Sequence, residues 1–192
     1  MKPFAVSLAG LAITVAALSY SKPAHALGPI GIEIAARGGF ATDPSSTDFG
    51  SNPYGAGFGG RAGVSIFGIY GGVSGIYYLG SSPAPGVSIH TAMYGFEAGY
   101  TLPIPVVQIR PEIGVGNSTI SASGSATSGG SSSNLYLEPG VLVMVPIGIM
   151  FVGADVNALI LPGVTTPGSL GNASSSSTYT SLSVHAQVGV HF

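Results

Sequence analysis

The chain has 192 residues and no cysteine, only 6% of its residues are charged, and its formal net charge is −2 with neutral histidines. A soluble domain carries about a quarter charged residues, so water is not expected to be the main solvent of this protein. Five basic residues exclude an electrostatic nucleic-acid binder, and the lack of cysteine excludes both a disulfide framework and a lipid-modified thiol.

The first 26 residues have the pattern of a secretory signal peptide. Met1-Lys2 precedes an apolar stretch from Phe4 to Leu18, and Ala24-His25-Ala26 provides a small-residue cleavage motif. We therefore expect residues 1–26 to be removed and residues 27–192 to form one domain. This mature part has three arginines, seven carboxylates and no lysine, and hence a formal net charge of −4.

The remaining sequence predicts strands, because no stretch of it has the 18 consecutive apolar residues of a membrane helix. A closed barrel is then the one way to span lipid with all backbone groups paired. Alternation of apolar and polar residues predicts an all-β fold, an eight-stranded antiparallel up-and-down transmembrane β-barrel. The predicted strands are residues 29–39, 56–67, 69–80, 89–102, 105–117, 133–145, 149–161 and 179–192.

The predicted connections alternate between long and short. Long stretches rich in Gly, Ser, Pro and Asp fall at 40–55, 81–88, 118–132 and 162–178, and short turns fall near Gly68, at Pro103-Ile104 and at Pro146-Ile147-Gly148. In outer-membrane barrels the long loops face outward and the tight turns face the periplasm. The Ser/Gly runs at 121–133 and 168–177 are expected to be mobile loops.

The charged residues within the predicted strands all fall on the polar face, the face opposite the apolar row. An arginine facing lipid at the bilayer midplane costs roughly 2–4 kcal/mol, which explains this segregation. The segment 69–80 is ambiguous; the assignment adopted for it puts Ile69 and Val73 on the apolar face and Tyr70 and Ser74 on the other. The predicted polar network of the lumen comprises Glu33, Arg37, Arg61, Glu97, Arg110, Glu112, Tyr136, Glu138, Asp155, Asn157 and His185.

Pairing inside this lumen depends on strand register. A two-residue hairpin at Leu102-Pro103-Ile104-Pro105 would place Glu97 opposite Arg110 and Gly95 opposite Glu112. Five carboxylates face three arginines, so at least two carboxylates would be hydrated, protonated or hydrogen-bonded. Many glycines share the polar face, and they would leave room for water if the lumen conducts.

The last strand alternates strictly from Leu182 to an aromatic C-terminus, Phe192. With the signal peptide, strand count, loop alternation and inward charges, the chain resembles the small eight-stranded outer-membrane barrels of the OmpA/OmpX type. The resemblance covers residues 27–192 and implies that Phe192 is read as an assembly signal by the barrel-assembly machinery. No peptidoglycan-binding domain is expected after the barrel.

These features predict a monomeric barrel in the outer membrane of a Gram-negative-type bacterium, with lipid and lipopolysaccharide as its surroundings. Its expected role is structural or surface interaction through loops 40–55, 118–132 and 162–178. An interior of eight strands is just wide enough for side chains to fill. A narrow ion channel is the first alternative. A lipid A-modifying enzyme is the second, with His90 beside Ser88 at the outer rim as its candidate.

No cofactor or metal site is expected. Residues 55–60 match the spacing of a dinucleotide-binding motif, but no strand precedes them and no helix follows. Four scattered histidines without cysteine give no metal-ligand spacing.

Overall fold

The computed structural model of the chain describes residues 30–42, 53–80, 82, 87–104, 106–124, 127–164 and 177–192. The predicted signal peptide, 1–26, lies outside these residues, as do Asp43 and Asp48 and most of the predicted loops at 40–55 and 162–178. The described part contains strands and turns, and no helix in it is long and apolar enough to cross a membrane.

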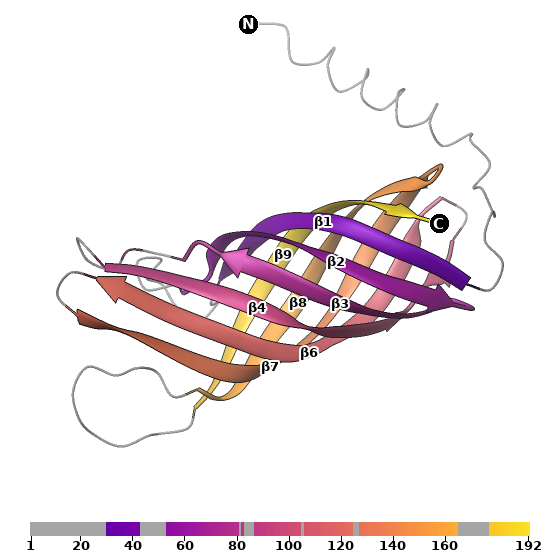
Figure 1. Ribbon diagram of the computed structural model, residues 1–192. Helices are drawn as coiled ribbons and strands as arrows, with labels where there is room; N and C mark the ends of the chain where they lie inside the picture. The colour runs from indigo at the N-terminus through magenta and orange to yellow at the C-terminus, as the bar shows by residue number, and fades with distance from the viewer. Residues whose placement is uncertain are drawn as a thin grey trace, which may run out of the picture.

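The strands form a closed antiparallel barrel (Figure 1). β4 and the short β5 pair with the same strand, β6, so that the nine strand segments make an eight-stranded wall. The sheet order is β4-β3-β2-β1-β9-β8-β7-β6, and the β4–β6 pairing closes it. The strands are β1 (Ile30–Thr42), β2 (Gly55–Ile66), β3 (Ile69–Tyr78), β4 (Val87–Tyr100), β5 (Leu102–Pro103), β6 (Gln108–Gly124), β7 (Thr127–Ile147), β8 (Met150–Val164) and β9 (Ser177–His191).

The strands are staggered around the barrel. A circuit of Cα partners that starts at Gly31 returns to β1 at Ala41, ten residues further along the strand. Such a stagger tilts the strands relative to the barrel axis and fixes the diameter, so that side chains fill the interior. The circuit runs through Gly31, Ser65, Tyr70, Gly99, Glu112, Gly140, Asn157, Ser183 and Ala41.

Burial alternates along each strand as a barrel wall requires. On β9 the even-numbered residues from Leu182 to Val188 are exposed, and the odd-numbered ones from Ser181 to Gly189 are buried. On β3, the ambiguous segment, Tyr70 is fully buried and Val73 is 50% exposed, which is the facing adopted from the sequence. Apolar side chains therefore cover the outside, and polar and aromatic ones fill the inside.

The hairpin of β6 and β7 is longer than the sequence predicted. Residues 118–132 were expected to be a loop, but β6 continues to Gly124 and β7 begins at Thr127. β6 has a neighbour on both sides along this stretch, because Val87 of β4 pairs with Gly124 and β7 follows on the other side. Backbone hydrogen bonds thus hold a Ser/Gly-rich segment that has few apolar side chains to pack.

The barrel has two unlike ends. The tight connections, Phe67-Gly68, the segment after Pro103, and Gly148-Ile149, lie at the end that also carries the start of β1 and the C-terminus (Figure 1). We call it the turn end and the opposite end the loop end. At Phe67-Gly68 both residues have positive φ, +50° and +85°, as in the turns that suit the twist of two-residue hairpins.

The predicted hairpin at Leu102-Pro103-Ile104-Pro105 is wrong. Leu102 pairs with Ile109 and Pro103 with Gln108, so Glu97 lies opposite Gly114 and Gly99 opposite Glu112. A two-residue hairpin turn needs a positive φ at its first residue, and the proline ring fixes φ near −65°. Pro103 is therefore the last paired residue before the turn, and the connection comprises the four residues 104–107 instead of two.

Candidate functional site

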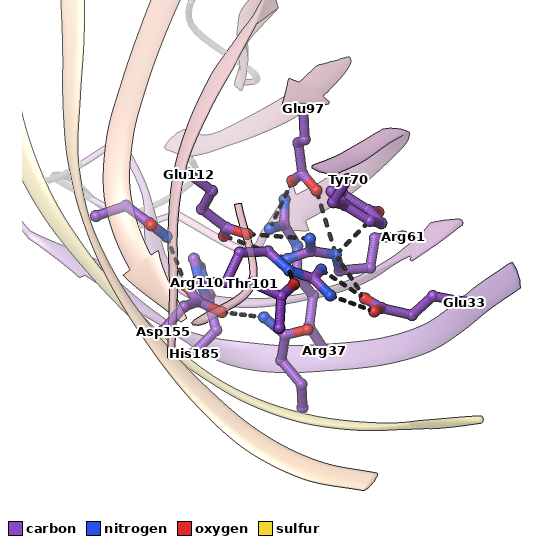
Figure 2. Close-up of polar contacts among 12 residues, drawn as sticks. Glu33, Arg37, Arg61, Tyr70, Glu97, Thr101, Arg110, Glu112, Asp155 and His185 are labelled. Atoms are coloured by element: carbon purple, nitrogen blue, oxygen red, sulfur yellow. Dashed lines mark hydrogen bonds and ion pairs between the residues drawn. The ribbon is translucent and has the colours of Figure 1, made fainter. Parts of the chain in front are cut away.

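The interior near the turn end holds a cluster of arginine and glutamate side chains, which we call the ion cluster. Its members come from four strands that face one another across the lumen (Figure 2). Inward alternation on each strand brings them there, because every second residue points inside. The ion cluster consists of Glu33 and Arg37 on β1, Arg61 on β2, Glu97 on β4, and Arg110 and Glu112 on β6.

Arg110 spans the lumen to Glu33. Its Nη1 and Nη2 atoms donate to the two carboxylate oxygens of Glu33 at 3.0 and 2.7 Å, and its Nε donates to Thr101 Oγ1 at 2.9 Å. This two-pronged geometry is the strongest arrangement of an arginine with a carboxylate. The pair joins β1 and β6, which are not neighbours in the sheet.

Arg61 lies at the centre of the ion cluster and contacts three carboxylates. Its Nη1 and Nη2 donate to Glu112 at 3.2 and 3.0 Å, while its Nε lies 3.3 Å from Glu97 Oε2 and 3.6 Å from Glu33 Oε1. Glu97 also accepts a hydrogen bond from Arg37 at 3.2 Å. Since the Arg61 side chain is fully buried, these carboxylates replace the water that would otherwise solvate its charge.

Tyr70 completes the ion cluster, although sequence reasoning did not include it. Its ring lies 4.7 Å from the guanidinium carbon of Arg61 and 4.1 Å from that of Arg110, within the range of cation–π attraction. Arg61 Nε also donates to its hydroxyl at 3.3 Å. Gly63 makes room for the ring, because a Cβ there would lie 2.7 Å from Tyr70. An aromatic ring thus fills the space beside Gly63. The sequence signal for it was that Tyr70 and Gly63 both fall on the polar face of their strands.

A second cluster lies on β8 and β9 and is centred on Asp155; we call it the aspartate cluster. His185 Nδ1 lies 2.7 Å from Asp155 Oδ1, and Asn157 Nδ2 donates to the same oxygen at 2.5 Å. Gln187 donates to the other oxygen, Oδ2. Tyr78 of β3 reaches across the lumen, and its hydroxyl lies 2.8 Å from His185 Nε2. The carboxylate therefore has hydrogen-bond partners on both of its oxygens.

Glu138 and Tyr136 lie on β7 beside these clusters. Ser183 Oγ donates to Glu138 Oε1 at 3.2 Å, and no arginine among the described residues lies within ion-pair distance of that carboxylate. Tyr136 belongs to an apolar group nearer the loop end. That group, which sequence reasoning missed, contains Ala41, Tyr54, Ile76, Tyr78, Met93, Leu159 and Leu161.

His90, the candidate for enzymatic chemistry, lies apart from the lumen residues. Its ring centroid is 5.7 Å from that of Tyr77, a residue 37% exposed on the outer face. The carboxylate side chains of the described strands are buried in the lumen, so none of them orients this imidazole. Within the described residues no group of three His, Asp or Glu side chains is arranged to hold a metal ion.

No family model matches the sequence, and no curated protein matches it. Solved structures do match. The N-terminal β-barrel domain of OprF from Pseudomonas aeruginosa is 15% identical with a TM-score of 0.58, and the match covers 84% of this chain and 97% of that one. The chain has the fold of the small eight-stranded outer-membrane barrels.

Other outer-membrane barrels give the same result. Neisserial surface protein A is 18% identical with a TM-score of 0.54, covering 86% of this chain and 98% of that one. A major outer membrane protein from Thermus thermophilus is 13% identical with a TM-score of 0.56, covering 86% and 100%. At these identities the likeness concerns the fold of the barrel.

Proposed function

We propose that the protein is a monomeric outer-membrane barrel with a structural or surface-interaction role and a lumen closed by its own side chains. Its surroundings would be lipid and lipopolysaccharide, and it would carry no enzymatic activity or cofactor. The ion cluster is the observation that carries this proposal. Three arginines, each at most 5% exposed, bridge β1, β2, β4 and β6 through direct ion pairs.

The physical argument concerns the cost of burying charge. Each isolated ion would lose several kcal/mol of solvation in the barrel, and pairing with hydrogen bonds offsets that cost. Arg110 and Glu33 satisfy each other through two bonds, and Tyr70 packs against Arg110. Paired in this way, the side chains of the lumen form a polar core whose contacts hold the strands of the barrel wall together.

A narrow channel is the second candidate, and the carboxylate surplus favours it. Glu138 is 5% exposed and has Ser183 as its hydrogen-bond partner rather than an arginine. A lumen with excess negative charge would favour cations if water entered it.

Conductance and stability together separate these candidates. The mature protein is refolded in detergent, its gel mobility is compared with and without heating, and the same sample is placed in a planar bilayer. We expect heat-modifiable mobility and no conductance steps. Discrete steps would favour the channel, and a protein that fails to enter detergent would overturn the membrane assignment.

Charge reversal provides a matched set of variants. R110E should destabilise the barrel by about 3–5 kcal/mol in urea unfolding, because it leaves Glu33 facing a second carboxylate. The double variant E33R/R110E restores an ion pair in the opposite sense and should recover part of that loss, since the new arginine also faces Arg61. If instead R110E changes conductance while stability is unchanged, the closed-lumen proposal is wrong.

A further inference from the structure

The apolar group that contains Tyr136 lies across the lumen near the loop end. Of the described residues that form it, Tyr54 alone lies outside a strand; the others belong to β1, β3, β4, β7 and β8, and Tyr179 of β9 packs against them. Tyr54 is in the connection between β1 and β2, directly before Gly55, where β2 begins. Its side chain is nevertheless fully buried. A residue of a connecting segment therefore fills the interior of the barrel.

Tyr54 occupies a sector of the lumen that β2 leaves without side chains. Gly57 and Gly59 are the inward positions of β2 at this level, since each pairs with a buried residue of β3. The Tyr54 ring meets the Tyr78 ring edge-on, with 5.4 Å between centroids, and stacks on Tyr179 at 6.1 Å. Aromatic contacts of both kinds are favourable. If the Tyr54 ring moved away, the two glycines of β2 would offer nothing to fill its place.

The segment Pro53-Tyr54 is anchored by bonds outside the strand ladder. The backbone nitrogen of Gly80 donates to the carbonyl oxygen of Tyr54 at 2.7 Å, and Thr91 Oγ1 donates to that of Pro53 at 2.7 Å. Gly55, the next residue, has a φ of +68°, a conformation that costs glycine little and makes it a suitable pivot. The segment can therefore swing outward about Gly55 without the loss of any strand pairing.

The aspartate cluster lies next to this ring on the inner side. Tyr78 contacts Tyr54 through its ring and His185 through its hydroxyl, which lies 2.8 Å from Nε2. His185 in turn binds Asp155. Outward movement of Tyr54 would uncover Tyr78 and give water a path from the loop end to the buried carboxylate.

We propose that Pro53-Tyr54 is a movable plug of the lumen. In place, it closes the loop end over the aspartate cluster; displaced about Gly55, it admits water and small ions to that cluster while the barrel wall stays intact. The ion cluster fills the lumen nearer the turn end, so the plug controls access from the loop end and not passage through the barrel. This inference rests on the proposed closed lumen.

A cysteine in place of Ser183 reports access of water beneath the plug. Ser183 is fully buried, its hydroxyl donates to Glu138, and the chain has no cysteine of its own. S183C is refolded in detergent, checked by heat-modifiable mobility, and treated with a small charged methanethiosulfonate. We expect slow labelling of S183C and labelling faster by about tenfold or more in Y54A/S183C, because alanine leaves a hole where the ring was. Y54F/S183C keeps the ring and should label nearly as slowly as S183C.

T91V tests whether the plug moves in the presence of its ring. Valine keeps the size of Thr91 but removes the hydroxyl that holds the carbonyl of Pro53. We expect S183C to label about fivefold faster in this background, the effect of one lost hydrogen bond on a local opening. The matched control is T119V, the same change on the outer face of β6, where the Thr119 hydroxyl lies 3.5 Å from that of Ser133. It should leave the labelling rate unchanged.

The outcomes separate the plug from the closed lumen. Slow labelling of both S183C and Y54A/S183C would overturn the plug and leave the closed lumen intact. Labelling of S183C at the rate of the unfolded protein, with Tyr54 in place, would overturn the closed lumen itself. Y54A is also combined with S65C, on the inner face at the turn end, where Ser65 pairs with the buried Tyr70. Equal acceleration of S65C and S183C would show a loosened barrel and contradict the plug, and equal rates in T91V and T119V would show that the segment does not swing.

Discussion

The two polar clusters of the lumen are held together in different ways. In the ion cluster each arginine binds a carboxylate from a strand that is not its neighbour, as Arg110 on β6 binds Glu33 on β1. In the aspartate cluster Asp155 and His185 are direct cross-strand partners on the adjacent β8 and β9. The bonds of Asp155 to its β8 and β9 partners therefore need one strand pairing, and the bond from Tyr78 to His185 adds one contact across the lumen. Each arginine of the ion cluster, by contrast, needs the barrel to be closed.

Because of this difference, the two clusters contribute to two different quantities, the stability of one strand pair and the stability of the closed barrel. A cross-lumen ion pair forms when distant strands have reached their final positions, so its free energy stabilises closure itself. A hydrogen bond between adjacent strands also stabilises an incomplete sheet. Substitutions in the ion cluster are thus expected to cost more and to affect the final folding step.

The largest expected effect is that of R61M. It removes the charge that faces Glu33, Glu97 and Glu112 while keeping an unbranched apolar stem in place of the arginine methylenes. Leaving buried carboxylates without their partner should cost about 3–5 kcal/mol in the free energy of unfolding, measured in urea by the loss of heat-modifiable mobility. R61K is the matched control and should retain more stability. A variant as stable as the wild type would show that the ion cluster does not stabilise closure.

A smaller loss is expected for D155N in the aspartate cluster. The amide keeps the size of the side chain but removes the charge and one acceptor that His185, Asn157 and Gln187 use. A charge-assisted hydrogen bond contributes about 1.5–3 kcal/mol, and we expect a loss of that order in the same unfolding assay. If D155N costs more than R61M, the ranking of the two clusters is wrong.

G63A tests the packing that holds Tyr70 against the arginines. A methyl group at this position would stand 2.6 Å from the backbone oxygen of Gly71 and 2.7 Å from the Tyr70 ring, so both the ring and the adjacent β3 backbone must move. Overpacking of this kind costs about 1–3 kcal/mol. The control is G71A, since a Cβ at Gly71 meets nothing within 4 Å. Equal stability of G63A and G71A would contradict a tightly packed lumen.

The smallest expected effect belongs to Y78F. It removes the hydroxyl that lies 2.8 Å from His185 Nε2 and leaves the ring in its buried place. Loss of one hydrogen bond should cost about 1 kcal/mol. A shift in the urea midpoint without a change in slope would report it, and a loss as large as that of R61M would show that this one cross-lumen bond stabilises closure as much as the ion cluster does.

The facing of residues was readable from the sequence, whereas their partners were not. Alternation with a period of two assigned Glu33, Arg61 and Arg110 to the inside, because any other facing would put charge against lipid. The expected neighbour of Arg110 was Glu97, but the structure pairs Arg110 with Glu33 across the lumen. Facing depends on residue spacing along one strand, while pairing across the lumen depends on stagger and closure.

Two predictions from the sequence were wrong, the hairpin at 102–105 and the loop at 118–132, and each has a local physical cause. Pro103 cannot occupy a two-residue hairpin turn, so the β5–β6 register moved and Glu97 came to lie opposite Gly114. The Ser/Gly run at 118–132 has a loop-like composition, yet backbone pairing with β4 and β7 extends the strands to Gly124 and Thr127. Composition reports side-chain packing, and it says little about whether the backbone has hydrogen-bond partners on a neighbouring strand.

The sequence by itself determined the fold class, the number of barrel strands and the face on which each charge lies. These follow from spacing, since a strand in a wall between an apolar and a polar medium must alternate at every residue. The tertiary structure alone decided the stagger of ten residues, the bridging of three carboxylates by Arg61 and the place of Tyr70 between two guanidinium groups. Those contacts join strands distant in the chain, so they exist only once the barrel has closed.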